Sequence, residues 1–228
     1  MDTQIQSDCV TRGITRLCHF TPSRNLLHVL SSRYLKDRQT LNLEGRDEVN
    51  PTDDLRLDGR LDKICCSVEY PNTYYLDKVV KKDQVFLDWV ILFLDPALLW
   101  APGTFFCPRN AATANGSLIA SGWSGYNAMF APKIQGAGDR LFTRRPSHLL
   151  SCPTDLQAEV LVSGPIPVEA IRGIAMKTDL QVRTERARWD TLGLPPLGAP
   201  AFVAPALFDK MQMTQRIWTG VRPIETPA

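Results

Sequence analysis

Short apolar runs separated by polar segments recur along the chain. We predict strands over residues 14–21, 64–68, 85–94 and 157–162. The run 85–94 is the most apolar of these, so we expect it to be the central strand. Residues 168–176 are expected to form a turn of helix followed by a further strand. Several short strands with few helices between them predict an α+β fold.

The segments between these strands differ in character. We predict a short helix over residues 24–31 and a helical turn over 73–82, whereas the strongly polar stretch 36–63 is expected to be a surface loop. Residues 110–151 are rich in Gly, Ala, Ser and Asn, with aromatic residues among them. The Pro-rich tail 192–228 is expected to wrap around the body, with one short helix near 208–216. We therefore predict a single domain over 1–228, with its core at about 14–180.

Composition narrows the class of protein without naming its function. The chain is 44% hydrophobic and 22% charged, which excludes collagen-like, coiled-coil and wholly disordered proteins. Its 26 Lys and Arg residues against 24 Asp and Glu give a formal charge of +2. Any contact with nucleic acid is therefore expected to be local, because the chain has no global basic field.

Targeting and metal-binding signals are weak in this sequence. Residues 1–8 are polar and do not resemble a signal peptide, and the apolar stretch 85–101 is too short and too charged to span a bilayer. The six cysteines include no C-x-x-C pair and no nearby histidine at metal-ligand spacing. We therefore expect free thiols, no bound metal, no membrane contact and a cytoplasmic location.

The first candidate for chemistry is Cys18-His19-Phe20-Thr21, at the end of the first predicted strand. A histidine in a strand can both donate and accept a hydrogen bond, so it can hold a ribose hydroxyl. Thr21 adds a second hydroxyl contact, and the main chain at Phe20 can meet a carboxamide. The alternative interpretation is a core histidine with purely structural contacts.

The second candidate is Glu159, in the apolar strand 157–162. On the alternating pattern, Ala158, Val160 and Val162 share one face of this strand. Glu159 shares the other face with Gln157 and Leu161. The carboxylate then faces either a cleft or the solvent side of an edge strand.

The third candidate is the alternating charge run 53–62, which contains Arg56 and Arg60. Such runs are commonly solvated salt-bridging surfaces, yet an arginine fork also matches phosphate and the edge of a base. Ser67 and Asn72 follow this run closely.

Taken in order, these motifs resemble the DarT family of DNA ADP-ribosyltransferases. The resemblance lies in residues 18–26, in 56–59 leading to Ser67 and Pro71-Asn72, and in 157–162, and it covers roughly residues 15–180. It implies an ADP-ribosyltransferase-like split mixed β-sheet, with short flanking helices and a long substrate-recognition loop. The stretch before Pro71-Asn72 is shorter than in the commoner form of the family, which leaves the target base open between guanine and thymine.

The same resemblance implies roles for individual residues. His19 and Thr21 would hold the sugars of NAD, the main chain at Phe20 would meet its carboxamide, and Asn25 would line the same pocket. Glu159 would be the catalytic glutamate. Arg56 is the better match to the catalytic arginine of the family, with Arg60 as a close competitor. A further set would complete the NAD and substrate contacts: Ser67, Asn72, Trp123, Tyr126, Arg144 and Arg145.

The chemistry agrees with these implied roles. Nicotinamide in NAD is already a cationic leaving group, so a single carboxylate that stabilises the oxocarbenium-like sugar is sufficient. Such a glutamate can also accept the proton of the attacking base, which must be single-stranded or flipped to enter the pocket. Family members are toxins held by a macrodomain antitoxin, so such a partner is implied here. Two alternatives stay open: transfer to RNA or protein, and a non-enzymatic nucleic-acid-binding module.

Overall fold

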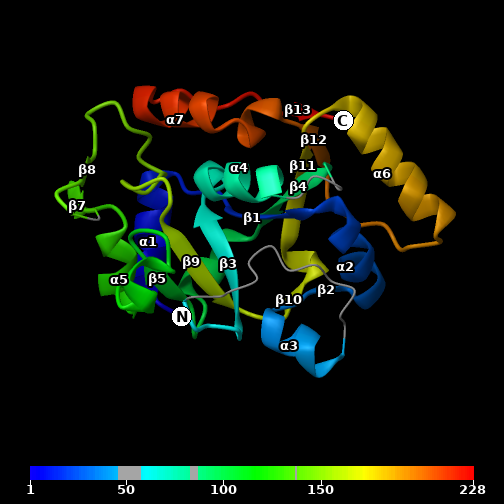
Figure 1. The fold of residues 1–228 in the computed structure, drawn as a ribbon, viewed down its shortest axis with the longest axis horizontal. Helices are drawn as coiled ribbons and strands as arrows, with labels where there is room; N and C mark the ends of the chain where they lie inside the picture. The colour runs from blue at the N-terminus through cyan, green and yellow to red at the C-terminus, as the bar shows by residue number, and fades with distance from the viewer. Residues whose placement is uncertain (46–57, 83–86, 137) are drawn as a thin grey trace.

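A nine-stranded mixed sheet organises the protein (Figure 1). The computed structural model describes residues 1–45, 58–82, 87–136 and 138–228. The sheet has the strand order β13-β12-β11-β4-β1-β3-β9-β5-β6. In chain order its strands are β1 (Leu17–Pro22), β3 (Lys63–Val68), β4 (Trp89–Leu94), β5 (Phe105–Cys107), β6 (Ala120–Ser121), β9 (Glu159–Ser163), β11 (Ile171–Met176), β12 (Ala201–Val203) and β13 (Thr226–Pro227). Neighbouring strands pair antiparallel, except that β11 and β12 are parallel.

The remaining elements flank this sheet. Two small ladders pair β2 (Tyr34–Leu35) with β10 (Ile166–Pro167), and β7 (Lys133–Gln135) with β8 (Leu141–Thr143). The α-helices in the described part of the chain are α1 (Thr3–Arg12), α2 (Leu26–Ser32), α3 (Arg38–Leu43), α4 (Thr73–Lys82), α5 (Gly122–Ala128), α6 (Asp179–Thr191) and α7 (Lys210–Thr219).

Strand β4 lies between β1 and β11, and all six of its residues are buried. Its side chains alternate between two cores, as the pleat of a strand requires. Val90, Leu92 and Leu94 belong to a core shared with α1, α2 and α6, whereas Ile91 and Phe93 belong to one shared with α4 and α7. Helices α4 and α7 lie together over that second face (Figure 1). The prediction of a central strand here is confirmed, although the strand begins at Trp89.

Several helices were not expected from the sequence. Helix α1 occupies the polar N-terminus and buries only Ile5 and Cys9, so its apolar face is too narrow to stand out in the pattern. Helix α6 buries Gln181 and Glu185 beside Val182, so its buried face is mostly polar. Helix α3 lies inside the predicted loop 36–63, and α5 lies inside the Gly-rich segment.

The C-terminal tail is tied to the start of β1 by a buried cluster of charged groups. Glu69 is fully buried, and its carboxylate accepts from Thr15 N at 2.7 Å and from the Arg222 guanidinium at 2.7 Å. Arg16 forms a two-bond ion pair with Glu225, one bond of which is 2.7 Å, and its guanidinium lies over the ring of Phe93. Strands β12 and β13 then extend the sheet beyond β11. The tail is therefore part of the sheet as well as a covering segment.

Candidate active site

The sheet splits between β1 and β3, and this split forms the candidate site. The two strands pair only at Leu17 with Val68 and at Cys18 with Ser67, although β1 pairs with β4 along all six of its residues. Beyond Cys18 the strands diverge, and a cavity of about 520 Å³ lies between them. That volume is within the range typical of small-molecule and cofactor sites.

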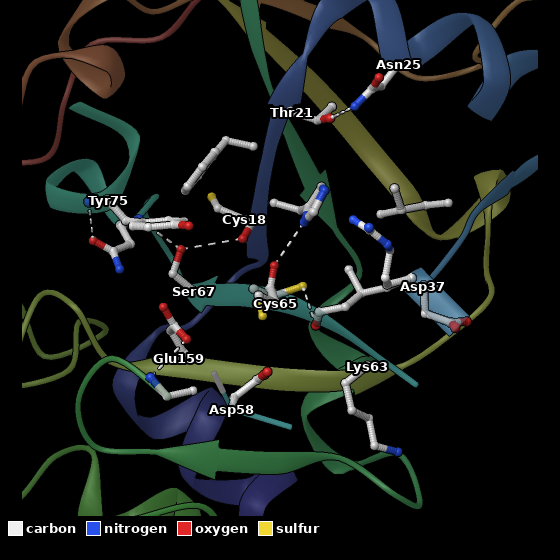
Figure 2. Close-up of a pocket in the computed structure, with 18 of the residues that line it drawn as sticks. Cys18, Thr21, Asn25, Asp37, Asp58, Lys63, Cys65, Ser67, Tyr75 and Glu159 are labelled. Carbon is white, nitrogen blue, oxygen red and sulfur yellow. Dashed lines mark hydrogen bonds between the residues drawn. The ribbon is translucent and has the colours of Figure 1, made fainter. Parts of the chain in front are cut away.

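Figure 2 shows the side chains that line this cavity, and most of the predicted NAD-binding residues are among them. The lining residues used below are His19, Phe20, Thr21, Asn25, Asp37, Arg38, Asp58, Lys63, Cys65, Ser67, Asn72, Tyr75, Asn110 and Glu159. They come from β1, β3, β9, α3, α4, the 3-10 turn before α2, and the segments before β3, before α4 and after β5. The split therefore brings together the three sequence motifs that lie far apart along the chain.

Glu159 is the first residue of β9, and its side chain lies beside Ser67 in the cavity (Figure 2). It is only 9% exposed. Ala158, Val160 and Val162 are buried in the core on the opposite face, which confirms the predicted alternation. Both carboxylate oxygens accept hydrogen bonds: Oε1 from Asn110 Nδ2 at 2.8 Å and Oε2 from Ala111 N at 3.1 Å. The structure thus places an oriented carboxylate in the cavity.

His19 spans the split between the diverging strands. Its Nδ1 lies 2.9 Å from the main-chain oxygen of Cys65, across from β1 on β3. Because a carbonyl oxygen only accepts, Nδ1 carries the proton, and in the neutral ring Nε2 is an acceptor. A half-buried imidazole held in one tautomer suits recognition of a sugar hydroxyl, as the sequence predicted.

The end of β1 is held by side-chain contacts on the same wall of the cavity. Asn25 Nδ2 donates to Thr21 Oγ1 at 2.9 Å. Ser23 Oγ donates to Glu185 Oε1 of α6 at 2.6 Å. Phe20 lies between the rings of Tyr75 and Trp89, with centroid distances of 6.2 Å to each. These contacts set the direction in which the chain leaves the split.

Ser67 and Asn72 are linked to each other at the Glu159 end of the cavity. Ser67 Oγ accepts from Asn72 N at 3.1 Å and donates to the Cys18 oxygen at 3.4 Å. Asn72 Oδ1 accepts from Tyr75 N at 3.1 Å, and therefore caps the start of α4. This contact identifies the other side-chain atom as Nδ2, which is buried and has no hydrogen-bond partner in the described part of the chain.

Two residues of the site were missed in the sequence. Asn110 was treated only as the start of the Gly-rich segment, yet it contacts the Glu159 carboxylate. Arg38 lies in the predicted loop 36–63, and its NH1 is buried without a hydrogen-bond partner among the residues described. The signals were weak: an asparagine three residues after a short strand, and an arginine that follows the helix-capping Asp37.

Arg56 and Arg60 are the two competing candidates for the catalytic arginine. Arg56 lies outside the described residues. Arg60 is exposed, with its guanidinium 4.9 Å from the centroid of the Phe105 ring, and the cavity lining as described does not include it.

The structure corrects part of the predicted substrate-contact set. Tyr126 is completely buried between Phe106 and Phe130, and its hydroxyl lies 3.5 Å from Cys9 Sγ, so the prediction that it contacts the substrate is wrong. Its aromatic ring fills the core instead, because α5 turns that face inward. Trp123 is half-buried against the same core and does not line the cavity.

Arg144 and Arg145 also have structural contacts away from the cavity. The Arg144 guanidinium donates to the main-chain oxygens of Cys152 and Leu149, each at 2.8 Å. It therefore holds together the segment that leads to β9. Arg145 is exposed, and its guanidinium lies 3.9 Å from the centroid of the Trp218 ring on α7. Contact of this exposed arginine with phosphate stays a prediction.

Within that segment His148 makes stability depend on pH. Burial, with Arg144 nearby, lowers the pKa of His148 to about 4, and its Nε2 donates to the Pro153 oxygen at 3.0 Å. The unfolded chain takes up this proton near pH 6.5, so the free energy of unfolding is expected to fall as the pH decreases from about 6.5 towards 4. The loss should be about 1–3 kcal/mol. Urea unfolding measured at several pH values in this range gives the free energy of unfolding as a function of pH. This free energy should depend less steeply on pH in His148→Gln than in the wild type, and an equal pH dependence would contradict the assignment.

The prediction of free thiols is confirmed. All six cysteines are free, and burial raises the pKa of the Cys107 thiol to about 11. Neither a helix long and apolar enough to cross a membrane nor a metal-binding group of His, Cys, Asp and Glu occurs within the described ranges.

Comparison with known proteins gives matches to DarT proteins. A family model described as "ssDNA thymidine ADP-ribosyltransferase, DarT" matches residues 18–197. The structure of Thermus sp. 2.9 DarT in complex with NAD+ matches with a TM-score of 0.57 and 15% identity, over 86% of this chain and 98% of that one. The same enzyme in complex with ADP-ribosylated ssDNA matches with a TM-score of 0.53 and 14% identity, over 86% and 97% of the two chains.

A third solved structure, Thermosipho africanus DarTG in complex with ADP-ribose, matches with a TM-score of 0.59 and 11% identity. The match covers 85% of this chain and 51% of that one. None of the curated proteins compared matches the chain. The structural matches confirm the predicted fold class, a mixed sheet split as in ADP-ribosyltransferases.

Proposed function

Because the chain belongs to the DarT family of single-stranded DNA ADP-ribosyltransferases, we propose that it transfers ADP-ribose from NAD to a thymine base and releases nicotinamide. The observation that carries this proposal is the position of Glu159. Its carboxylate is oriented by two hydrogen bonds, and it lies in a cavity formed by the split between β1 and β3. An oriented carboxylate in a partly closed cavity is the group that an oxocarbenium-like sugar requires.

We propose that NAD lies along β1, with His19 and Thr21 holding its sugars. The main chain at Phe20 would meet the carboxamide, and Asn25 would support Thr21 through the hydrogen bond between their side chains. Arg38 is a candidate for the pyrophosphate, because its buried NH1 lines the cavity wall without a protein partner in the described chain. An anion there would satisfy a charged donor that is otherwise costly to bury. The sequence favours Arg56 over Arg60 as the catalytic arginine, and that assignment is retained as part of the proposal.

The reaction needs one bond to break and one to form at the same carbon. The bond between the anomeric carbon and nicotinamide breaks, and its electron pair leaves with neutral nicotinamide. A ring nitrogen of the base then forms a bond to that carbon, and its proton passes to Glu159. The glutamate acts first as the negative charge that stabilises the electron-poor sugar and later as the proton acceptor.

The donors and acceptors at the Glu159 end favour thymine or guanine over the other bases. Glu159 can accept a hydrogen bond and then the proton, whereas the buried Nδ2 of Asn72 can donate a hydrogen bond. Thymine presents a ring N–H beside a carbonyl on its Watson–Crick edge, and so does guanine. Adenine and cytosine present no ring N–H there, so each would face Glu159 with an acceptor. We propose thymine as the first candidate, which agrees with the description of the family, and guanine as the second.

A modified base would block copying of the DNA, so we further propose that the enzyme is a toxin held by a macrodomain-type antitoxin. The match to a DarTG chain of which this protein covers 51% supports this proposal. The partner would remove or shield the ADP-ribose mark.

Mass spectrometry of oligonucleotides incubated with the protein and NAD tests the function directly. Four single-stranded oligonucleotides would each consist of one kind of base, with their Watson–Crick duplexes and matched RNA as comparisons. We expect addition of one ADP-ribosyl group to the thymine or guanine strand, with stoichiometric release of nicotinamide and little reaction in the duplex. Transfer only to RNA or to protein would overturn the DNA proposal. Binding without nicotinamide release would favour the non-enzymatic alternative.

A further inference from the structure

Asn110 makes a bridge between its own loop and the Glu159 carboxylate. It lies three residues after β5, and β5 pairs with β9 at Cys107 and Glu159. Its Nδ2 donates to Glu159 Oε1 at 2.8 Å, while its Oδ1 accepts from Ala112 N at 3.1 Å. Both ends of the side-chain amide are therefore used, and the second contact fixes which end faces the carboxylate.

The neighbouring main chain repeats the same contact from the other side. Ala111 is 1% exposed in a small core with Cys107 and Leu161, and its N–H donates to Glu159 Oε2 at 3.1 Å. Each carboxylate oxygen thus receives one donor from the same turn. An ionised carboxylate has about four acceptor positions, so these two donors do not use its full acceptor capacity.

We propose that Asn110 is a positioning residue for the reaction, which keeps Glu159 ionised and aimed at the sugar. The effect of Asn110 on catalysis rests on the proposed function, whereas its effect on the Glu159 carboxylate does not. Hydrogen bonds to the charged form of a carboxyl favour that form, so the Asn110 donor extends the activity of Glu159 to lower pH. It opposes the burial of the carboxylate, which favours the protonated form.

Several other ionisable groups lie near Glu159. Burial raises the pKa of the Cys66 and Cys107 thiols, so both are neutral from pH 5 to 9. The remaining charged groups facing this end of the site are Asp58 and Lys63 in the cavity, and the Arg109–Asp155 pair beside Cys107. Burial raises the pKa of Asp155, whose carboxylate is paired with Arg109.

The Asn110→Asp variant separates this role from support of the loop. Aspartate keeps an oxygen for Ala112 N and is nearly the same size, but it presents an oxygen instead of a donor to Glu159. Two facing carboxyl groups share a proton more readily than one alone. In Asn110→Asp, we expect the acid limb of the plot of kcat for ADP-ribose transfer against pH to move to higher pH by about one unit or more. Below that limb, kcat should be about tenfold lower than in the wild type.

Asn127→Asp is the matched control, because it adds the same charge at an exposed position on α5. Its pH profile should superimpose on that of the wild type. Asn110→Ser, which lacks the amide without adding a charge, should shift the limb in the same direction by a smaller amount. A uniform loss of kcat at every pH in the Asn110 variants would show a merely structural role and overturn the proposal.

A second measurement is independent of activity. Carbon-13 labelling of glutamate carboxyl groups, with the Glu159 signal assigned by Glu159→Gln, follows its titration in the protein without NAD. The signal should titrate at higher pH in Asn110→Asp than in the wild type, and an unchanged titration would contradict the proposal. If the wild type transferred no ADP-ribose, the proposed function would fail, while this titration would still decide whether Asn110 controls Glu159.

Discussion

Replacing Glu159 by glutamine lowers the rate of ADP-ribose transfer by at least about 10³-fold, if the proposed function is right. The amide has almost the same shape as the carboxylate, so it can still occupy the space between Asn110 and Ala111. It carries no negative charge to stabilise the sugar as nicotinamide leaves, and it is too weak a base to take the proton of the attacking nitrogen. The effect should fall on kcat more than on the binding of NAD, because the charge matters most in the transition state.

The measurement is single-turnover transfer to the oligonucleotide that the wild type modifies best, together with nicotinamide release. Glu159→Ala should be at least as inactive and should keep the wild-type circular dichroism spectrum. Glu169→Gln is the control, because it removes an exposed carboxylate whose partner is Arg33 on the surface. Activity close to that of the wild type in both Glu159 variants would remove this strand from the mechanism.

Replacing Glu69 by alanine is expected to lower the free energy of unfolding by about 1–3 kcal/mol. The Glu69 side chain is completely buried and is the shared acceptor for Thr15 and Arg222. Its removal leaves the Thr15 N–H and the Arg222 guanidinium without their charged partner. The Arg222 side chain is 52% exposed and Thr15 is exposed as well, so both regain water, and the cost is the loss of hydrogen bonds to a charged acceptor.

Urea denaturation at pH 7 would measure this loss, with the tryptophan fluorescence and the far-ultraviolet circular dichroism followed together. Arg222→Ala should destabilise the protein in the same direction, and the double variant should lose less than the sum of the two single losses, because both act through one contact. Glu169→Ala should change the free energy by less than about 0.5 kcal/mol. Additive losses would show that Glu69 and Arg222 do not act as a pair.

The strands were predicted well where the residues alternate or form dense apolar runs. Residues 64–68 and 157–162 became β3 and β9 with shifts of one or two residues. The helical turn predicted at 73–82 is the complete helix α4. These segments face a core on at least one side, and their buried positions therefore carry apolar residues in a pattern that the sequence shows directly.

Other elements depend on partners that the local sequence does not reveal. Helix α6 buries Glu185, which is accommodated because Ser23 and Arg188 donate to its carboxylate. Tyr126 looked like an exposed aromatic among glycines, yet the packing of α5 against β5 places it in the core. The polar N-terminus forms α1 because Ile5 and Cys9 meet an existing core. In each case burial was decided by a surface made elsewhere in the chain.

By itself, the amino-acid order determined the types of element, the position of the acidic residue at the start of a late strand and the succession of motifs shared with one enzyme family. Only the folded chain decided which polar groups share a cavity, because β1 and β3 diverge after a pairing of two residues. That divergence sets His19 across from Cys65 and lets a turn 49 residues earlier in the chain hold the Glu159 carboxylate. Contacts at such separations follow from strand order and packing, which local patterns of polar and apolar residues do not encode.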